Sequence, residues 1–244
     1  MRKVAQINEF DADRLPVPDI WSAHGWAQPY HFVDTLRRRA AGLDPATIQQ
    51  QLTRQVNSAA DQILTWKNVK SAMERRSGYA WATGTTPAPV LDALNRIVWA
   101  AMGQERWLAA GVHLQSVDGY DDGPYAFADH PRRLDPRTNG ADPATMLFRT
   151  SQGQSWIPGD GLTFLLGIDW EFAAESGVDP DLAYAHALRA VGRLGHMLLL
   201  EGHRHGLSAR MTPAVLESEA NGMLEFGPDR DILYMIRMGV VAGA

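Results

Sequence analysis

Apolar residues recur every three or four positions in three stretches of the chain, which is the spacing of one helix face. The pattern predicts helices over residues 44–66, 87–102 and 179–206. Asp44-Pro45 and Asp179-Pro180 are helix-start signals, because Asp is a common N-cap and Pro is favoured at the first helical position. At 1.5 Å per residue the third helix is roughly 39 Å long, so we expect it to span the whole molecule.

Other apolar stretches have the spacing or the length of strands. Val112, Leu114 and Val117 alternate with polar residues and lead through turn signals to Tyr125–Ala128, which predicts a hairpin. Leu162–Ile168 is continuously apolar, as in a strand buried on both faces. The remaining expected elements are a strand at 145–148 within an otherwise loop-like 130–160, a short helix opened by Thr212-Pro213, and a strand at 232–238. Together these elements predict an α+β fold with helices packed on a mixed sheet.

The N-terminal region has a different character. Residues 1–30 contain three prolines and several aromatic residues without a sustained period, which predicts an extended arm that docks onto another surface. We therefore expect an N-terminal arm and helix over 1–66, followed by a core over 67–244, within one compact domain.

Composition and charge narrow the class of protein. The 244 residues are 45% hydrophobic and 21% charged, which is typical of a soluble globular protein with a sizeable core. With 23 basic and 28 acidic residues the net charge is -5, so nucleic acid is not expected as a partner. No stretch of about 18 apolar residues occurs, and the N-terminus lacks an apolar signal region, so we expect a cytoplasmic protein without a membrane span. The absence of cysteine excludes disulfides, thiolate metal sites and a Cys nucleophile.

Several clusters of polar residues favour ordinary structural roles. On a helix, His205 lies about 200° round from His203, so these residues with His196 do not form a metal site. Glu201 is expected to pair with His205 four residues later. The acidic residues Glu217 and Glu219 follow a helix-start signal and are expected to face solvent. Serine-hydrolase, P-loop and dinucleotide-binding motifs are absent.

Arg75-Arg76-Ser77 has two interpretations. Two guanidinium groups and a hydroxyl just before a turn supply donors suited to a phosphate or a carboxylate. Equally, basic residues at the C-terminal end of a helix complement the helix dipole without binding any ligand. The residues alone leave both interpretations open.

Five features of the chain, taken in order, resemble one known family. They are Tyr30-His31 with Thr35, Arg75-Arg76-Ser77, the hairpin from Val117 to Tyr125, the helix from Tyr184 to Leu207, and the strand from Leu233 to Gly239. In this order the chain resembles the nitroreductase superfamily and, within it, the SagB-type thiazoline/oxazoline dehydrogenases that act on modified peptides.

The resemblance implies both a fold and a cofactor. The implied fold is an FMN-binding α+β fold, with a mixed sheet flanked by helices and a long central helix. The implied oligomeric state is an obligate homodimer. Arg75, Arg76 and Ser77 match the segment that holds the FMN phosphate and the adjoining polar edge of the flavin. The implied substrate is a peptide or a small molecule, and a partner protein of the same biosynthetic pathway is a further expectation.

The chain also departs from the family pattern at several places, and two of these departures concern the flavin ring and the catalytic pair. The family stretch whose backbone lies against the flavin ring belongs between Met102 and Val112, and here it is missing. The Lys-Tyr pair that precedes the long helix in the family is replaced by Glu175-Ser176, so Glu175 becomes the candidate base and Tyr184 the candidate acid.

Four alternatives therefore remain open. The first is an FMN-dependent oxidoreductase that acts on a modified peptide or a peptide-derived intermediate in natural-product biosynthesis. The second is a flavin-free member that serves as a non-catalytic partner subunit, and the third is a flavin-free enzyme of different chemistry. The last is an unrelated fold. Eight tryptophans suit either a bound flavin or a space filled by side chains.

Overall fold

A computed structural model describes most of the chain beyond residue 79. The described residues are 80–128, 133–138, 142–171 and 180–241, with the side chains of the long helix from His186 onward. The expected arm and the helix over 44–66 lie outside these residues, so the division into 1–66 and 67–244 stays a prediction.

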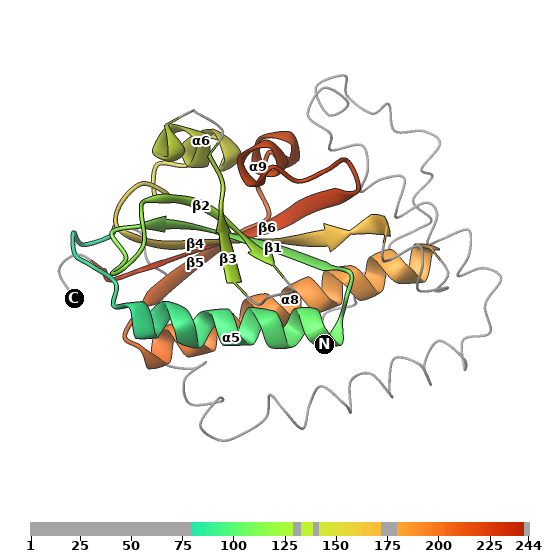
Figure 1. Cartoon of the computed structure of the whole chain (residues 1–244), viewed down its shortest axis with the longest axis horizontal. Helices are drawn as coiled ribbons and strands as arrows, with labels where there is room; N and C mark the ends of the chain where they lie inside the picture. Colours follow the sequence, from blue (N-terminus) through green and yellow to red (C-terminus); the bar gives the residue numbers. More distant parts are fainter. Residues whose placement is uncertain (1–79, 129–132, 139–141, 172–179, 242–244) are drawn as a thin grey trace, which may run out of the picture. The chain divides into compact units, whose positions relative to one another are not determined.

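Six strands form one sheet in the order β3-β2-β1-β4-β6-β5 (Figure 1). The strands are β1 (Leu108–Gln115), β2 (Gly123–Ala128), β3 (Arg133–Pro136), β4 (Gly161–Asp169), β5 (Ser208–Thr212) and β6 (Arg230–Gly239). All five neighbouring pairs are antiparallel. The prediction of a mixed sheet is therefore wrong for the described strands. Short connections join β1, β2 and β3, and short connections force antiparallel pairing.

Helices cover both faces of this sheet (Figure 1). The helices α5 (Ala88–Gln104) and α8 (Pro180–Arg204) lie side by side on one face, and α6 (Pro143–Thr150) and α9 (Glu217–Leu224) lie on the other. The predicted helices over 87–102 and 179–206 are thus confirmed. The predicted hairpin and the strands at 162–168 and 232–238 are confirmed as well, so the predicted α+β class is correct.

The predicted strand at 145–148 is wrong, because these residues lie in α6. Asp142 is the N-cap of α6, and its carboxylate accepts hydrogen bonds from the backbone N–H and the hydroxyl of Thr145. Pro143 follows at the first helical position, where its missing N–H costs nothing. These start signals outweigh the strand propensity of the short segment. The helix expected from Thr212-Pro213 exists as α9, but it begins four residues later at Glu217.

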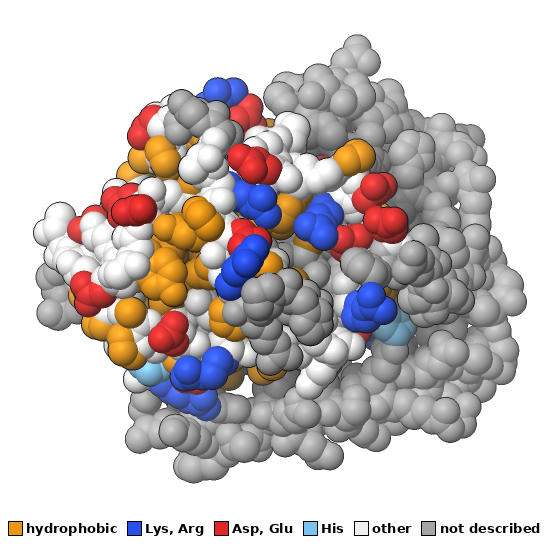
Figure 2. All heavy atoms as spheres, viewed as in Figure 1, with side chains coloured by type: hydrophobic (Ala, Val, Ile, Leu, Met, Phe, Trp, Pro, Cys, Tyr) orange, Lys and Arg blue, Asp and Glu red, His pale blue; other side chains and the backbone are white. Residues whose placement is uncertain are grey.

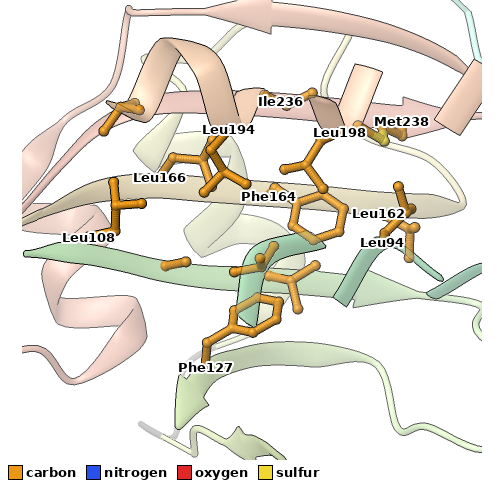
Figure 3. Close-up of a cluster of buried hydrophobic side chains, with 14 of the residues drawn as sticks. Leu94, Leu108, Phe127, Leu162, Phe164, Leu166, Leu194, Leu198, Ile236 and Met238 are labelled. Carbon is orange, nitrogen blue, oxygen red and sulfur yellow. The ribbon is translucent and has the colours of Figure 1, made fainter. Parts of the chain in front are cut away.

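The face under α5 and α8 holds the larger apolar core. Alternate residues of β1, β4 and β6 point into it and pack against both helices. Figure 3 shows part of this cluster, in which Phe164 lies beside Leu198 of α8. Both residues have no exposed surface. Every residue of β4 is buried, as the continuous apolar run of its sequence predicts.

The face under α6 and α9 holds a second, smaller apolar cluster. It contains Leu165 and Met235 of the sheet with Met223 and Leu224 of α9. A Cβ atom at Gly111 of β1 would clash with the Leu224 side chain, so a larger residue here would force Leu224 to move. The helix α9 therefore rests directly on the backbone of β1.

Candidate functional site

The residues that the sequence singles out lie mostly outside the described part of the chain. Arg75, Arg76, Ser77 and Glu175 are all outside it, and only the backbone of Tyr184 is described, on α8. Their roles therefore stay predictions.

Trp170 belongs to a group of polar side chains where β4 ends and β6 begins. We call Asp169, Trp170, Arg230 and Asp231 the charged end of the sheet. The buried Asp169 carboxylate accepts from Arg230 Nε at 2.7 Å, and the indole N–H of Trp170 donates to Asp231 Oδ2 at 2.5 Å. A buried carboxylate needs such a partner, because desolvation disfavours its charged form. None of these four residues was singled out from the sequence.

The corner between α5 and β1 adjoins the charged end of the sheet, since the backbone N–H of Asp169 donates to the Trp107 carbonyl oxygen at 2.7 Å. Within this corner, Glu105 accepts from the Trp107 indole N–H at 2.8 Å and from Arg193 of α8 at 2.9 Å. The Trp107 ring lies 6.0 Å from the His186 ring. Burial, together with the Arg189 charge, lowers the pKa of His186.

A row of polar side chains crosses the other half of the sheet, on the face of α6 and α9. His113 of β1 pairs with Thr163 of β4, Thr163 pairs with Arg237 of β6, and Arg237 pairs with Arg210 of β5. Directly paired residues of antiparallel strands point to the same face. These four residues form what we call the polar row, in which all but Arg210 are at least 98% buried.

Arg237 donates to five backbone carbonyl oxygens and to no carboxylate within the described part of the chain. Its acceptors are the carbonyls of Ile157, Gly159, Asp160, Leu162 and Met238, at 2.5 to 3.2 Å. Burial lowers the pKa of Arg237 to about 10, so the side chain keeps its charge at neutral pH. The guanidinium also lies 5.0 Å from the centre of the Trp81 ring. Arg237 therefore holds the 157–162 segment in place and is not available to a ligand.

His113 is the titratable group of the polar row. It is 2% exposed, and its Nε2 atom has no hydrogen-bond partner. Burial, reinforced by the Arg237 charge, lowers the pKa of His113 to about 4. His113 is consequently neutral at physiological pH.

Arg210 ends the polar row at the edge strand β5. Its guanidinium carbon lies 4.4 Å from the centre of the Trp156 ring, which is a cation–π contact. The Trp156 carbonyl in turn accepts the indole N–H of Trp81 at 2.5 Å. Two tryptophans, Trp81 and Trp156, thus lie between Arg237 and Arg210 at this end of the sheet.

The other polar clusters singled out from the sequence have different outcomes. Glu217 and Glu219 are both half-buried, which corrects the expectation that they face solvent. His205 lies 3.3 Å from Glu201, which confirms the expected pair. Among the described residues, no group of three potential ligands could hold a metal ion, and no helix is long and apolar enough to cross a membrane. On the face in Figure 2, acidic and basic side chains of the described residues are interspersed, so charge of one sign does not gather there.

Comparisons with known proteins identify the fold of the chain. No family model matches the chain, and no curated protein matches it. A solved structure assigned as a nitroreductase from Anabaena variabilis has a TM-score of 0.62 at 17% identity, over 72% of this chain and 38% of that one. Nitroreductase A from Vibrio parahaemolyticus has a TM-score of 0.54 at 11% identity, over 72% of this chain and 68% of that one. The chain has the nitroreductase fold.

A third solved structure with a similar fold comes from a synthetase complex. It is a chain of the Escherichia coli microcin synthetase complex McbBCD with truncated pro-MccB17 bound. Its TM-score is 0.56 at 15% identity, over 68% of this chain and 69% of that one. At such identities the likeness extends to the fold, and the chemistry must be argued from this chain's own residues.

The corner between α5 and β1 tests whether a nitroreductase-type flavin fits here. The family resemblance assigns a stretch that faces the flavin ring to the interval between Met102 and Val112. In this chain α5 ends at Gln104 and β1 begins at Leu108, so three residues, Glu105 to Trp107, make the whole connection. The side chains of Glu105 and Trp107 are engaged with each other and with α8. The described residues therefore do not fit the ring end of FMN as the family holds it.

Proposed function

We propose that the chain is an oxidoreductase of the nitroreductase fold that acts on a peptide or a peptide-derived intermediate in natural-product biosynthesis. Two findings support this proposal: the fold shared with proteins named as nitroreductases, and the likeness to a chain of a microcin synthetase complex. A cytoplasmic homodimer, with a pathway partner protein, is part of the proposal.

The proposed cofactor is FMN, held at its phosphate end by Arg75, Arg76 and Ser77. Bound FMN would supply the capacity to accept or return a hydride. Glu175 is the proposed base, and Tyr184 is the proposed acid. Since Glu175-Ser176 replace the Lys-Tyr pair of the family, we expect little or no azoline dehydrogenase activity from this chain, with or without added FMN.

One observation favours a second candidate. This candidate is a flavin-free protein that serves as a partner subunit or catalyses a different reaction. The three-residue connection at Glu105 to Trp107 leaves no loop to lie against a flavin ring. Trp107 packs against His186 there, so side chains of this chain fill the corner. Both candidates keep the proposed peptide substrate.

Flavin absorbance of the purified full chain distinguishes the two candidates. If FMN is bound, the protein is yellow, and the variant with both Arg75→Ala and Arg76→Ala loses the flavin while remaining folded. Truncation of surface arginines costs less than about 0.5 kcal/mol. Arg96→Ala is the matched control, because Arg96 is an exposed arginine on α5. A colourless protein that stays colourless after FMN addition would leave the flavin-free candidate.

Sedimentation at micromolar concentration tests the proposed homodimer. Obligate dimers bury about 2,000 Å² or more, so the dimer should persist on dilution. A monomer at this concentration would contradict the proposed homodimer. It would not change the conclusion drawn from flavin absorbance.

A further inference from the structure

The backbone of the connection between α5 and β1 is held in place by hydrogen bonds along its whole length. The N–H of Glu105 donates back to α5 at 2.8 Å, and the Glu105 carbonyl oxygen accepts from the N–H of Leu108 at 3.0 Å. The Trp107 carbonyl oxygen accepts from the N–H of Asp169, the last residue of β4, at 2.7 Å. Moving the connection would break these hydrogen bonds, so its side chains are held in the corner.

The indole ring of Trp107 takes up the space beside α8. The side chain is half-buried, and the centre of its ring lies 6.0 Å from that of His186, with the two ring planes inclined by 36°. Atoms in contact lie about 3.5 to 4.0 Å apart, so a third planar ring between these two would need a separation of about 7 Å. A ligand ring therefore does not fit between Trp107 and His186 while the indole stays where it is.

Glu105 fixes the polar edge of the same indole. One oxygen of its carboxylate, Oε2, accepts the Trp107 indole N–H at 2.8 Å, and the other, Oε1, accepts from Arg193 Nη2 of α8 at 2.9 Å. A carboxylate is a strong acceptor for an N–H donor, and its pairing with Arg193 fixes its direction. A ring face and a fixed acceptor are the two parts from which a site for a planar heteroaromatic ring is built.

We propose that the corner between α5 and β1 is an aromatic subsite that the chain fills with its own Trp107, and that it takes a planar ring with an N–H donor once this indole is removed. A second consequence rests on the FMN cofactor proposed above: when FMN binds, its isoalloxazine ring lies outside this corner. A flavin ring inside the corner would have to expel the indole and break its hydrogen bond to Glu105.

Indole and 1-methylindole test the subsite, because only indole has the N–H that Glu105 accepts. Their binding to the full chain is measured by calorimetry for wild type, Trp107→Ala and the double variant Trp107→Ala/Glu105→Ala. We expect Trp107→Ala to gain a site that wild type lacks, and to bind indole there at least about tenfold more tightly than 1-methylindole, since a hydrogen bond to a charged group contributes that much. The double variant should lose this preference. If Trp107→Ala gains no site, or binds both probes equally, the proposed subsite is wrong.

The wild-type chain tests the consequence for FMN. In protein labelled with ¹⁵N at tryptophan, the indole N–H signal that is lost in Trp107→Phe reports on the corner while FMN is added. We expect this signal to stay unchanged as FMN binds. If the signal shifts or vanishes on binding, the flavin ring enters the corner, so the inference is wrong while the proposed cofactor stands. If FMN does not bind, the proposed cofactor is wrong, and the indole experiment alone decides the subsite.

Discussion

The two faces of the six-stranded sheet bury different kinds of side chain. Under α5 and α8 the buried residues are almost all apolar, and the core is continuous from Leu94 to Met238. Under α6 and α9 the same strands bury the polar row, with Arg237 at its centre. The difference arises from the alternation of apolar and polar residues along each strand, because neighbouring residues of one strand point to opposite faces. It shows that one face is stabilised by apolar packing, and that the other combines a smaller apolar cluster with satisfied hydrogen bonds.

The largest expected effect is on the polar face. Arg237→Met would remove the donor from five backbone carbonyls, and each buried carbonyl left without a partner costs about 1 to 3 kcal/mol. We expect a loss of at least about 5 kcal/mol, which is comparable with the whole stability of a domain. Denaturant unfolding measures it. Arg237→Lys, which keeps the charge but has fewer donors, should recover part of the loss. An Arg237→Met variant as stable as wild type would show that these hydrogen bonds do not stabilise the fold.

On the apolar face we expect a smaller loss. Leu198→Ala removes a side chain with no exposed surface from between α8 and the sheet, and should cost about 2 to 5 kcal/mol. Leu188→Ala on the same helix is the control, because Leu188 is 40% exposed, and it should cost less than about 1 kcal/mol. Equal losses in the two variants, measured by urea unfolding, would mean that α8 does not pack on the sheet by this face.

The faces should also differ in their response to acid. The pKa of His113 is lowered to about 4 in the folded chain, from 6.5 in the unfolded chain, so only the unfolded chain gains a proton between these values. Stability is then full above pH 6.5 and falls by about 3 kcal/mol as the pH drops to 4. His113→Leu should remove this part of the pH dependence in unfolding curves at pH 7.5 and 4.5. An unchanged pH dependence in the variant would show that His113 is already charged when folded.

The smallest effect is expected at the exposed end of α8. Glu201→Gln breaks contacts with Arg204 and His205, both on the surface, and such pairs are worth less than about 1 kcal/mol. The thermal midpoint should therefore move very little. A large shift would mean that this end of the helix supports more of the structure than its exposed ion pairs indicate.

The elements that sequence could predict are those with a long, unbroken pattern. The helices α5 and α8 and the strand β4 are examples, because many residues in each agree on one period. The segment at 145–148 was misassigned because strand propensity over four residues is weaker than the cap formed by Asp142. The short strands β3 and β5 carry too few residues to show a period at all.

The candidate site was less accessible to sequence. Arg237 and His113 stand out in their apolar segments, but only the strand register shows that they belong to one row. The resemblance did indicate the short interval before β1, and the three-residue connection confirms that the interval is short.

The hydrogen bonds from Arg237 to five backbone carbonyls have a consequence for proteolysis and for engineering. Surface segments between strands are usually where a domain opens first, where proteases cut and where insertions are tolerated. The segment from Ile157 to Asp160 cannot open in this way without detaching a buried guanidinium, so its opening requires nearly the same free energy as global unfolding. A protease site or a peptide tag inserted there should disrupt the protein, although the segment has the composition of an ordinary loop.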